Sequence, residues 1–534
     1  MAAAGPLSSD AVATSDPKKA YSPAPGPSRA AVVVWLPALA AVFYALLHLN
    51  WYLGTPLGRV PVLDERENLD LANAIFGRTL PAEPLYRAPG YALLLALVRW
   101  AGVGPAGLFP AALLLGTLLH GANAGLVASL ARRWFGNGAA VIGGLLFALD
   151  PVLVHYATQA LDSTFSLTLF LAGLGFLASA LAQPTRTAAW AGAGILWACA
   201  VLVRPNYLLV WLTAPLLAAM QPLPGSVRLR TLLASLAGIV LFLASAMWQK
   251  AETGTAGFLP WQGPYNLWAA NRSGANGRYY SQKVSLPPVL ARMNPARSES
   301  LILYESETNG GPTDIASMNA HWRRRFLDEV TSHPVAWARL MARKAYALAN
   351  NWEQYNNKTF AFHKALSPWL RWNPICWGLL FVLAVLGAAR LAAESPRTAA
   401  ALAVVVGACT ISIILFFVSA RFRLPLAAVC AVLSGGALSS PLFWRGWSGA
   451  GRAALAACAA IAAFLAFSNL GGVAGRETFV QDHALLARAA YTVGDDALAL
   501  SEARAALELQ PQHPDALAIE RAAEAELAGK APSQ

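Results

Sequence analysis

Four carboxylates lie within seven positions of one another at the end of the first long apolar run of this chain. They are Asp64, Glu65, Glu67 and Asp70, in the segment VLDERENLDLANAIFGR. Beside a lipid–water interface, a carboxylate can accept the proton of an attacking hydroxyl or amine. Alternatively, all four keep a surface helix soluble and interact with the positive end of its dipole. As an exposed charge at a helix start, Asp64 is expected to contribute only about 0.3–1 kcal/mol to folding.

A second group of polar residues lies in the segment LDPVLVHYATQALDSTF, after a later apolar run. Asp162 is predicted to be a further carboxylate of the site, where it would hold an acceptor molecule or, with Asp64, a divalent cation. His155 is another metal-ligand type, but the spacing of these residues is not that of a tight metal site. A divalent cation is therefore the one cofactor that the sequence leaves open.

Arginines stand at the ends of other apolar runs, Arg204 in VRPN and Arg421 and Arg423 in SARFRLP. An arginine in apolar surroundings is costly and tends to mark an ion partner. Because guanidinium groups match phosphate oxygens with paired hydrogen bonds, we interpret these three side chains, together with Arg87, as a clamp for a phosphate. The alternative is that each of them reaches to the membrane interface as an anchor.

The chain that carries these residues is strongly apolar. Of its 534 residues, 56% are hydrophobic and 13% are charged, whereas about a quarter are charged in a typical soluble domain. The net charge of +12 comes from Lys and Arg scattered between apolar runs, as in a polytopic membrane protein, so no nucleic-acid partner is expected. The five cysteines all fall inside apolar runs and indicate neither a disulfide framework nor a metal cluster.

Eleven apolar segments are predicted to cross a membrane, which makes the chain an all-α polytopic membrane protein. They lie near 31–53, 105–131, 138–152, 163–182, 188–203, 206–220, 231–249, 373–390, 398–419, 424–439 and 453–470. Every second connection carries arginine: Arg132, Arg133, Arg186, Arg228, Arg230, Arg390, Arg397, Arg445 and Arg452. The positive-inside rule places these connections and the N-terminus in the cytoplasm. The carboxylates and the C-terminus then face outside, in what we predict to be a bacterial inner membrane.

The spans divide the chain into five predicted regions. These are a disordered cytoplasmic N-terminus (1–30), a transmembrane module (31–249) with an outer loop (54–104), a large extracytoplasmic loop (250–371), further transmembrane helices (372–470) and a helical tail (482–531). In the outer loop, 64–76 is predicted to be an amphipathic surface helix, and 91–100 is too short to cross. In the large loop, 258–280 is predicted to be an irregular binding loop followed by two helices. The tail resembles about one and a half tetratricopeptide repeats.

From about residue 31 to 440 the chain resembles the GT-C glycosyltransferases, and within them the family 39-like group of protein mannosyltransferases and aminoarabinose transferases. The resemblance rests on seven elements in the family's order: the pair Asp64 and Glu65, YRAPGY (86–91), LDPVLVHYATQALDSTF (149–165), LVRP (202–205), GPYNLWAANRSGANG (263–277), HPVAWARLMARKAYALANNWEQYNN (333–357) and SARFRLPL (419–426).

The resemblance implies a GT-C fold and transfer of a monosaccharide from a polyprenyl-phosphate donor to an extracytoplasmic protein, lipid or envelope glycan. It makes Asp64 the base of an inverting transfer, with Glu65 as a weaker candidate. The donor phosphate would contact the four arginines named above. The large loop would shape the substrate site through Asn266, Asn271, Lys344 and Glu353.

Other functions fit parts of the pattern. An enzyme similar to O-antigen ligases or oligosaccharyltransferases also combines many spans with a large outer loop, but such enzymes usually place key residues in that late loop. A transporter would carry polar residues or helix breaks at mid-membrane depth, whereas the charges here gather at span ends. A non-catalytic scaffold would bind a protein partner through the tail and would not need the acidic loop. Membrane lipids are partners in every case.

Overall fold

The computed structural model describes residues 27–282, 284, 294–311 and 314–530. These residues form helices joined by turns, with one isolated β-bridge between Asn356 and Lys358 and no strand among them. The predicted disorder of 1–30 falls mostly on 1–26, which lie outside the described residues. From Pro27 onward the chain belongs to α1 (Pro27–Leu53).

Eight helices in the described part of the chain are long and apolar enough to cross a membrane. They are Ala31–Leu53 of α1, Pro105–Phe135 with α5 (Leu108–Phe135), α8 (Asp162–Ala182), Gly225–Thr253 with α11 (Gly225–Ser235) and α12 (Ile239–Thr253), α18 (Trp377–Glu394), α19 (Pro396–Leu415), α20 (Ala420–Ser439) and α21 (Gly449–Phe467). The chain is therefore an integral membrane protein of helical type, as its sequence predicts.

The three remaining predicted spans are helical but differ from simple crossings. α6 (Asn137–Ala148) and α7 (Pro151–Ala157) make a pair bent by 59°. Pro151 opens α7, and Asp150 caps it by accepting hydrogen bonds from Val152 N and Leu153 N at 2.8 and 3.3 Å, which explains the break. The other two are the shorter helices α9 (Thr187–Val203) and α10 (Leu208–Ala219). Counting the bent pair as one crossing gives nine long spans, fewer than the eleven predicted.

α20 lies at the centre of the bundle and is almost entirely buried. Glycines allow its neighbours to come close, because a Cβ on Gly435 would lie 2.5 Å from Ala139 O and one on Gly387 would lie 1.9 Å from Leu433 O. Small residues at helix contacts serve this purpose in membrane proteins. The close packing holds the first turn of α20, which carries Arg421, in the middle of the molecule.

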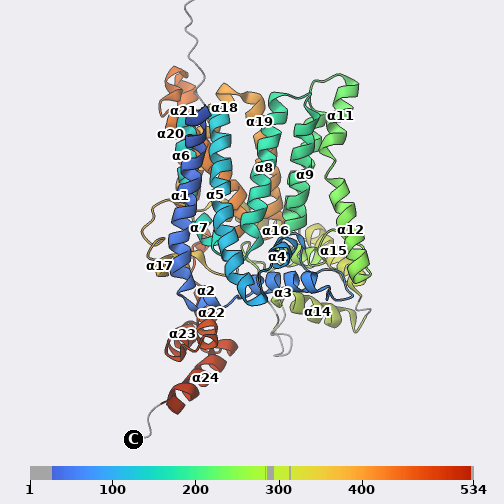
Figure 1. Cartoon of the computed structure of the whole chain (residues 1–534), viewed down its shortest axis with the longest axis vertical. Helices are drawn as coiled ribbons and strands as arrows, with labels where there is room; N and C mark the ends of the chain where they lie inside the picture. The colour runs from blue at the N-terminus through green and yellow to red at the C-terminus, as the bar shows by residue number, and fades with distance from the viewer. Residues whose placement is uncertain (1–26, 283, 285–293, 312–313, 531–534) are drawn as a thin grey trace, which may run out of the picture.

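The non-spanning helices gather at one end of the bundle (Figure 1). α1 leads at that end into α2 (Pro56–Arg59), followed by α3 (Asp64–Gly77) and α4 (Gly90–Trp100). The predicted surface helix and the short helix after it are thus present. The large loop adds α13 (Gly263–Asn271), α14 (Pro295–Thr308), α15 (Ile315–Ser332), α16 (Pro334–Ala349) and α17 (Phe360–Leu366). The prediction that 258–280 is irregular is partly wrong, because α13 packs its aromatic side chains against α15.

The C-terminal helices α22 (Phe479–Thr492), α23 (Asp496–Leu509) and α24 (Pro514–Lys530) lie beyond α2, at the end of the bundle farthest from the start of α1 (Figure 1). Gly494, with φ of +81°, makes the predicted turn between the first two. Their likeness to a tetratricopeptide repeat stays a prediction, as does the choice of which membrane side is cytoplasmic.

Candidate active site

A cavity of about 2440 Å³ opens among the non-spanning helices. Its charged lining includes Asp64, Glu67, Arg87, Asp162, Arg204 and Arg421. These side chains come from α3, from the segment before α4, and from the ends of α8, α9 and α20. We call these six residues the cavity cluster. It combines residues from both predicted groups, the carboxylates and the phosphate clamp.

Asp64 begins α3 and is 8% exposed, so its predicted exposure is wrong. Its carboxylate accepts a hydrogen bond from Arg421 Nη1 at 2.9 Å and pairs with Arg87 on the other side. Burial raises the pKa of Asp64, but the positive charges of Arg87 and Arg421 together outweigh it and hold that pKa below its usual range. Asp64 is thus a carboxylate kept ionised by two guanidinium groups.

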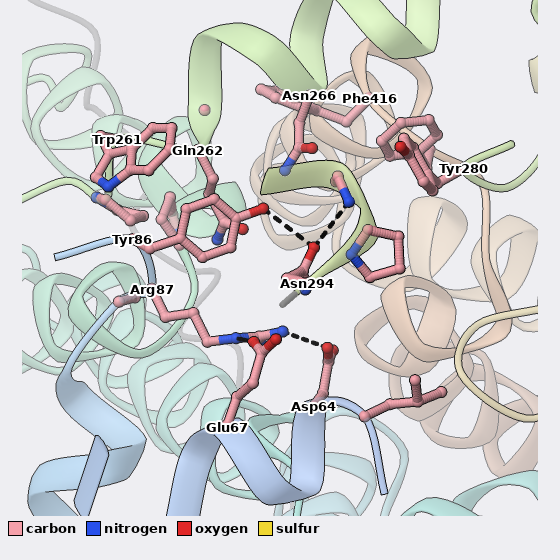
Figure 2. Close-up of a pocket in the computed structure, with 18 of the residues that line it drawn as sticks. Asp64, Glu67, Tyr86, Arg87, Trp261, Gln262, Asn266, Tyr280, Asn294 and Phe416 are labelled. Atoms are coloured by element: carbon pink, nitrogen blue, oxygen red, sulfur yellow. Dashed lines mark hydrogen bonds and ion pairs between the residues drawn. The ribbon is translucent and has the colours of Figure 1, made fainter. Parts of the chain in front are cut away.

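Arg87 lies between Asp64 and Glu67 and pairs with both, as Figure 2 shows. Burial raises the pKa of Glu67, and the neighbouring charge of Asp64 adds to this, against the effect of Arg87. Because two carboxylates already occupy Arg87, its guanidinium is less available to a phosphate than the prediction assumed. The structure places it as the group that orients Asp64.

Arg204 and Arg421 have donor atoms left over. Arg204 Nε pairs with Asp162 at 3.4 Å, and its Nη1 donates to the carbonyl of Arg421 at 3.3 Å. Within the described part of the chain, Arg204 Nη2 and Arg421 Nε are buried without a hydrogen-bond partner, and so is Asp162 Oδ1. A buried donor left unpaired costs free energy, so a ligand that accepts from these nitrogens would bind favourably.

Glu65 does not face the cavity. It is 1% exposed and pairs with Lys358, whose Nζ lies 3.1 Å from both carboxylate oxygens and 2.8 Å from Tyr52 Oη. Glu65 also accepts from Val62 N at 3.3 Å, which holds the chain as it enters α3. The prediction of Glu65 as a reserve base is therefore not supported by its position, and we assign it to holding α3 in place.

Arg423 and Glu353 pair with each other at 2.5 Å, away from the cavity. Arg423 also donates to the carbonyls of Leu348 and Asn350 and lies over the ring of Trp377. The structure does not bring this arginine to the predicted phosphate clamp. We call the pairs Glu65–Lys358 and Arg423–Glu353 the buried pairs.

Two of the predicted substrate-loop residues also lie outside the cavity lining. Lys344 Nζ donates to Phe416 O at 2.7 Å and to Asn271 Oδ1 at 3.3 Å, and Asn271 donates to Leu415 O at 2.8 Å. Burial lowers the pKa of Lys344 to about 7. These contacts tie α13 and α16 to the end of α19. Asn266, in contrast, lines the cavity.

The residues do not fit the metal site that the sequence left open. Both carboxylate oxygens of Asp64 already have an arginine partner, and Asp162 pairs with Arg204. His155 is buried elsewhere, with its Nε2 2.8 Å from Gln159 Nε2 and its ring against His363. Across 27–282, 284, 294–311 and 314–530, no three His, Cys, Asp or Glu side chains are grouped to hold a metal ion.

Several cavity residues were missed by the sequence analysis. Tyr86 Oη donates to Asn294 Oδ1 at 3.2 Å, and its ring meets Trp261 edge to face at 4.9 Å (Figure 2). Further lining residues labelled there are Gln262, Tyr280 and Phe416. Tyr86 stands beside Arg87 in YRAPGY, and Trp261 belongs to the aromatic run at 258–280, so both carried a signal. Asn294 carried none.

No protein-family model matches the chain, and no curated protein matches its sequence. Among solved structures, it is similar to the oligosaccharyltransferase of Archaeoglobus fulgidus in complex with zinc and sulfate, at 15% identity and a TM-score of 0.44, over 85% of this chain and 55% of that one. The same archaeal enzyme in complex with an inhibitory peptide and a dolichol-phosphate is similar at 16% identity and a TM-score of 0.44, over 86% of this chain and 58% of that one.

ArnT from Cupriavidus metallidurans bound to undecaprenyl phosphate is similar at 15% identity and a TM-score of 0.30, over 78% of this chain and 79% of that one. Both similar enzymes are GT-C glycosyltransferases, the group that the sequence resembles. This chain spans little more than half the length of the archaeal enzyme.

Proposed function

We propose that the protein is a membrane glycosyltransferase that moves a sugar from a polyprenyl-phosphate-linked donor to an acceptor outside the cytoplasm. The observation that carries the proposal is the unpartnered N–H groups of Arg204 and Arg421, buried beside the carboxylates of Asp64 and Asp162 in one large cavity. An anion site next to a positioned carboxylate is what transfer from a phosphate leaving group needs.

The donor phosphate would accept from Arg204 Nη2 and Arg421 Nε. Arg421 lies in the first turn of α20, where the helix dipole disfavours a cation but attracts an anion. Arg204 follows directly after α9. Because both stand at the ends of apolar helices, a phosphate held there would leave a polyprenyl chain free to lie in the bilayer. Guanidinium groups would also stabilise charge on the leaving phosphate.

Asp64 would accept the proton. In the step, the acceptor oxygen or nitrogen bonds to the anomeric carbon, the bond from that carbon to the phosphate oxygen breaks with its electron pair, and the acceptor's proton passes to Asp64. Free Asp64 is a weak base because two arginines lower its pKa. A phosphate on Arg421 would compete for that guanidinium and place negative charge nearby, and both effects raise the pKa toward that of a useful base.

The experiment has two stages. Mass spectrometry of envelope proteins and lipids from cells with and without the gene identifies the product, and the mass added distinguishes a monosaccharide from an oligosaccharide donor. Membranes holding equal amounts of folded wild type, Asp64→Asn or Asp70→Asn are then compared for transfer from the matching labelled donor. Asp70 is the control, because it lies on the same helix and also lines the cavity, but its side chain is largely exposed and pairs only loosely with Arg66, at 3.8 Å. No difference between cells with and without the gene would refute the proposal.

A further inference from the structure

The cavity is much larger than the donor's headgroup requires. Its volume of about 2440 Å³ exceeds the roughly 300–1,000 Å³ typical of a site for one small molecule. Part of its lining comes from the C-terminal helices: Gln481, Ala484, Leu485, Arg488, Gln510, His513, Pro514, Asp515 and Ala518. We call these nine residues the C-terminal wall. They belong to α22, to the connection between α23 and α24, and to the start of α24.

The C-terminal wall is firmly attached to the rest of the protein. Asp482 of α22 accepts from Thr359 N at 2.8 Å and contacts His363 Nε2 at 3.0 Å. Thr478 Oγ1 lies 2.7 Å from Thr359 Oγ1, and Leu486 belongs to the same apolar cluster as α2. These contacts hold α22 in a defined place against the cavity, unlike a tail tethered only by its chain connection.

The same short segment links the wall to the proposed base. Lys358 pairs with Glu65, the neighbour of Asp64 in α3, and Thr359 N donates to Asp482 of α22. Two consecutive residues therefore connect the start of α3 with the C-terminal helices. This stretch of backbone, together with the packing of Leu486 against α2, holds the wall in place relative to Asp64.

We propose that the C-terminal wall is the outer half of the acceptor site and that its occupant is an extended polypeptide segment. This rests on the proposed function. The C-terminal helices lie beyond α2, at the end of the molecule opposite the start of α1 (Figure 1), so an acceptor reaching the wall would come from water and not from the bilayer. It offers amide side chains, an imidazole, and charges of both signs in the Arg488–Asp515 pair. Such a set matches main-chain amides and mixed side chains.

The test places a bulky side chain at exposed positions of the C-terminal wall, where it should block an acceptor without disturbing the fold. Ala518 lines the cavity and is exposed on α24, whereas Ala525, two turns further along the same helix, is also exposed but lies outside the cavity lining. Ala518→Trp should lower transfer to the polypeptide acceptor at least tenfold, and Ala525→Trp should leave it unchanged. Gln481→Trp, exposed on α22, provides an independent second obstruction.

Each variant is expressed in cells lacking the native gene, and modified envelope polypeptides are quantified by mass spectrometry. Binding of undecaprenyl phosphate to the purified protein in nanodiscs checks the fold and the donor site, and it should equal wild type in all three variants. Normal transfer by both Ala518→Trp and Gln481→Trp would overturn the wall as an acceptor site. A lipid or glycan product in wild-type cells would overturn the polypeptide, and no product at all would instead refute the proposed function.

Discussion

The cavity cluster and the buried pairs contain the same residue types, often as close neighbours in sequence, yet they differ in which hydrogen-bonding atoms remain available to a ligand. Asp64 and Glu65 are adjacent, and Arg421 and Arg423 are two apart. Asp64 and Arg421 line the cavity, whereas Glu65 forms an ion pair with Lys358, and Arg423 forms one with Glu353. Arg204 Nη2 and Arg421 Nε are buried without a hydrogen-bond partner in the described part of the chain. Arg423 Nη2 also lacks a hydrogen bond, but it lies 2.5 Å from the carboxylate of Glu353 in an ion pair. A buried ion pair alone therefore does not identify a ligand site, whereas guanidinium N–H donors without a partner beside a cavity do.

Helix geometry explains why neighbours separate so completely. Each residue of an α-helix turns the side chain by about 100°, so two residues turn it by about 200°. Arg421 and Arg423 in the first turn of α20 accordingly point to nearly opposite sides. One side of α20 faces the cavity and the other faces α16 and the loop after it. The following predictions test whether the cavity cluster serves transfer and the buried pairs serve stability.

The largest effect is expected for Asp64→Asn, which keeps the side chain's shape but cannot accept a proton. Removal of a general base typically lowers the rate by about a hundredfold to ten-thousandfold. Because Asp64 is buried between two arginines, the change should also destabilise the protein, by up to about 3–5 kcal/mol for a broken buried pair. The rate is therefore measured per folded molecule in the labelled-donor assay. A near-normal rate per folded molecule would move the search for a base to Asp162.

Glu65→Gln should have the opposite pattern of effects, with a large loss of stability and little change in the rate of transfer. It leaves Lys358 charged and buried without its carboxylate, which costs about 3–5 kcal/mol of stability. Transfer per folded molecule should remain within a few-fold of wild type. Thermal unfolding in detergent measures the first quantity and the labelled-donor assay the second.

A double variant sharpens this test. Glu65→Gln combined with Lys358→Met removes the unpaired charge and should recover much of the lost stability. A rate loss as large as that of Asp64→Asn in folded Glu65→Gln would show that the buried pairs are part of the chemistry.

The two arginines of α20 should separate in ligand binding. Arg421→Ala removes charged hydrogen bonds worth about 1.5–3 kcal/mol, so undecaprenyl phosphate should bind roughly ten- to a hundredfold more weakly. Arg421→Lys should recover binding only in part, since an ammonium group lacks the paired fork. Arg423→Ala should lower thermal stability and leave binding by the folded fraction unchanged. Arg445→Ala, in the predicted cytoplasmic connection, should change neither ligand binding nor thermal stability. If all four variants bound undecaprenyl phosphate equally well, Arg421 would be an anchor at the membrane interface and not part of a phosphate site.

The smallest effect on sugar transfer is expected for Lys344, which belongs to neither set and has no described carboxylate partner; its substitution should change the pH dependence of stability instead. Its pKa is about 7 when folded, below about 10.4 for a free lysine. Below pH 7 both states carry the proton and the folded state bears the full cost of a buried charge. As pH rises from 7 toward 10, the unfolded state holds more protons, so stability should rise.

Lys344→Met should abolish this part of the pH dependence and stabilise the protein most at pH 6–7. Thermal unfolding of both proteins at pH 6.5 and 9 gives the comparison. A wild-type midpoint that does not rise relative to the variant between these pH values would contradict the low pKa.

Much of the fold followed from local patterns. All eleven predicted apolar segments are helical, although only eight, or nine with the bent pair, are long and apolar enough to cross a membrane. The amphipathic spacing predicted α3, because helix periodicity acts within one segment. The residue types of the cavity cluster were also legible, since carboxylates and arginines at span ends are costly unless they have partners. The bend between α6 and α7 lies at Asp150 and Pro151, at the end of the predicted span 138–152.

The tertiary structure alone decided which of those residues share the cavity. Arg421 meets Asp64 across 357 residues of sequence, and Lys358 meets Glu65 across 293. Nothing within a segment distinguishes Asp64 from Glu65, because each partner is brought by a helix that packs elsewhere in the chain. The same holds for Asn294 and the C-terminal wall, which reach the cavity through long-range packing. Sequence determines which side chains are able to do chemistry, and packing determines which of them keep atoms free to do it.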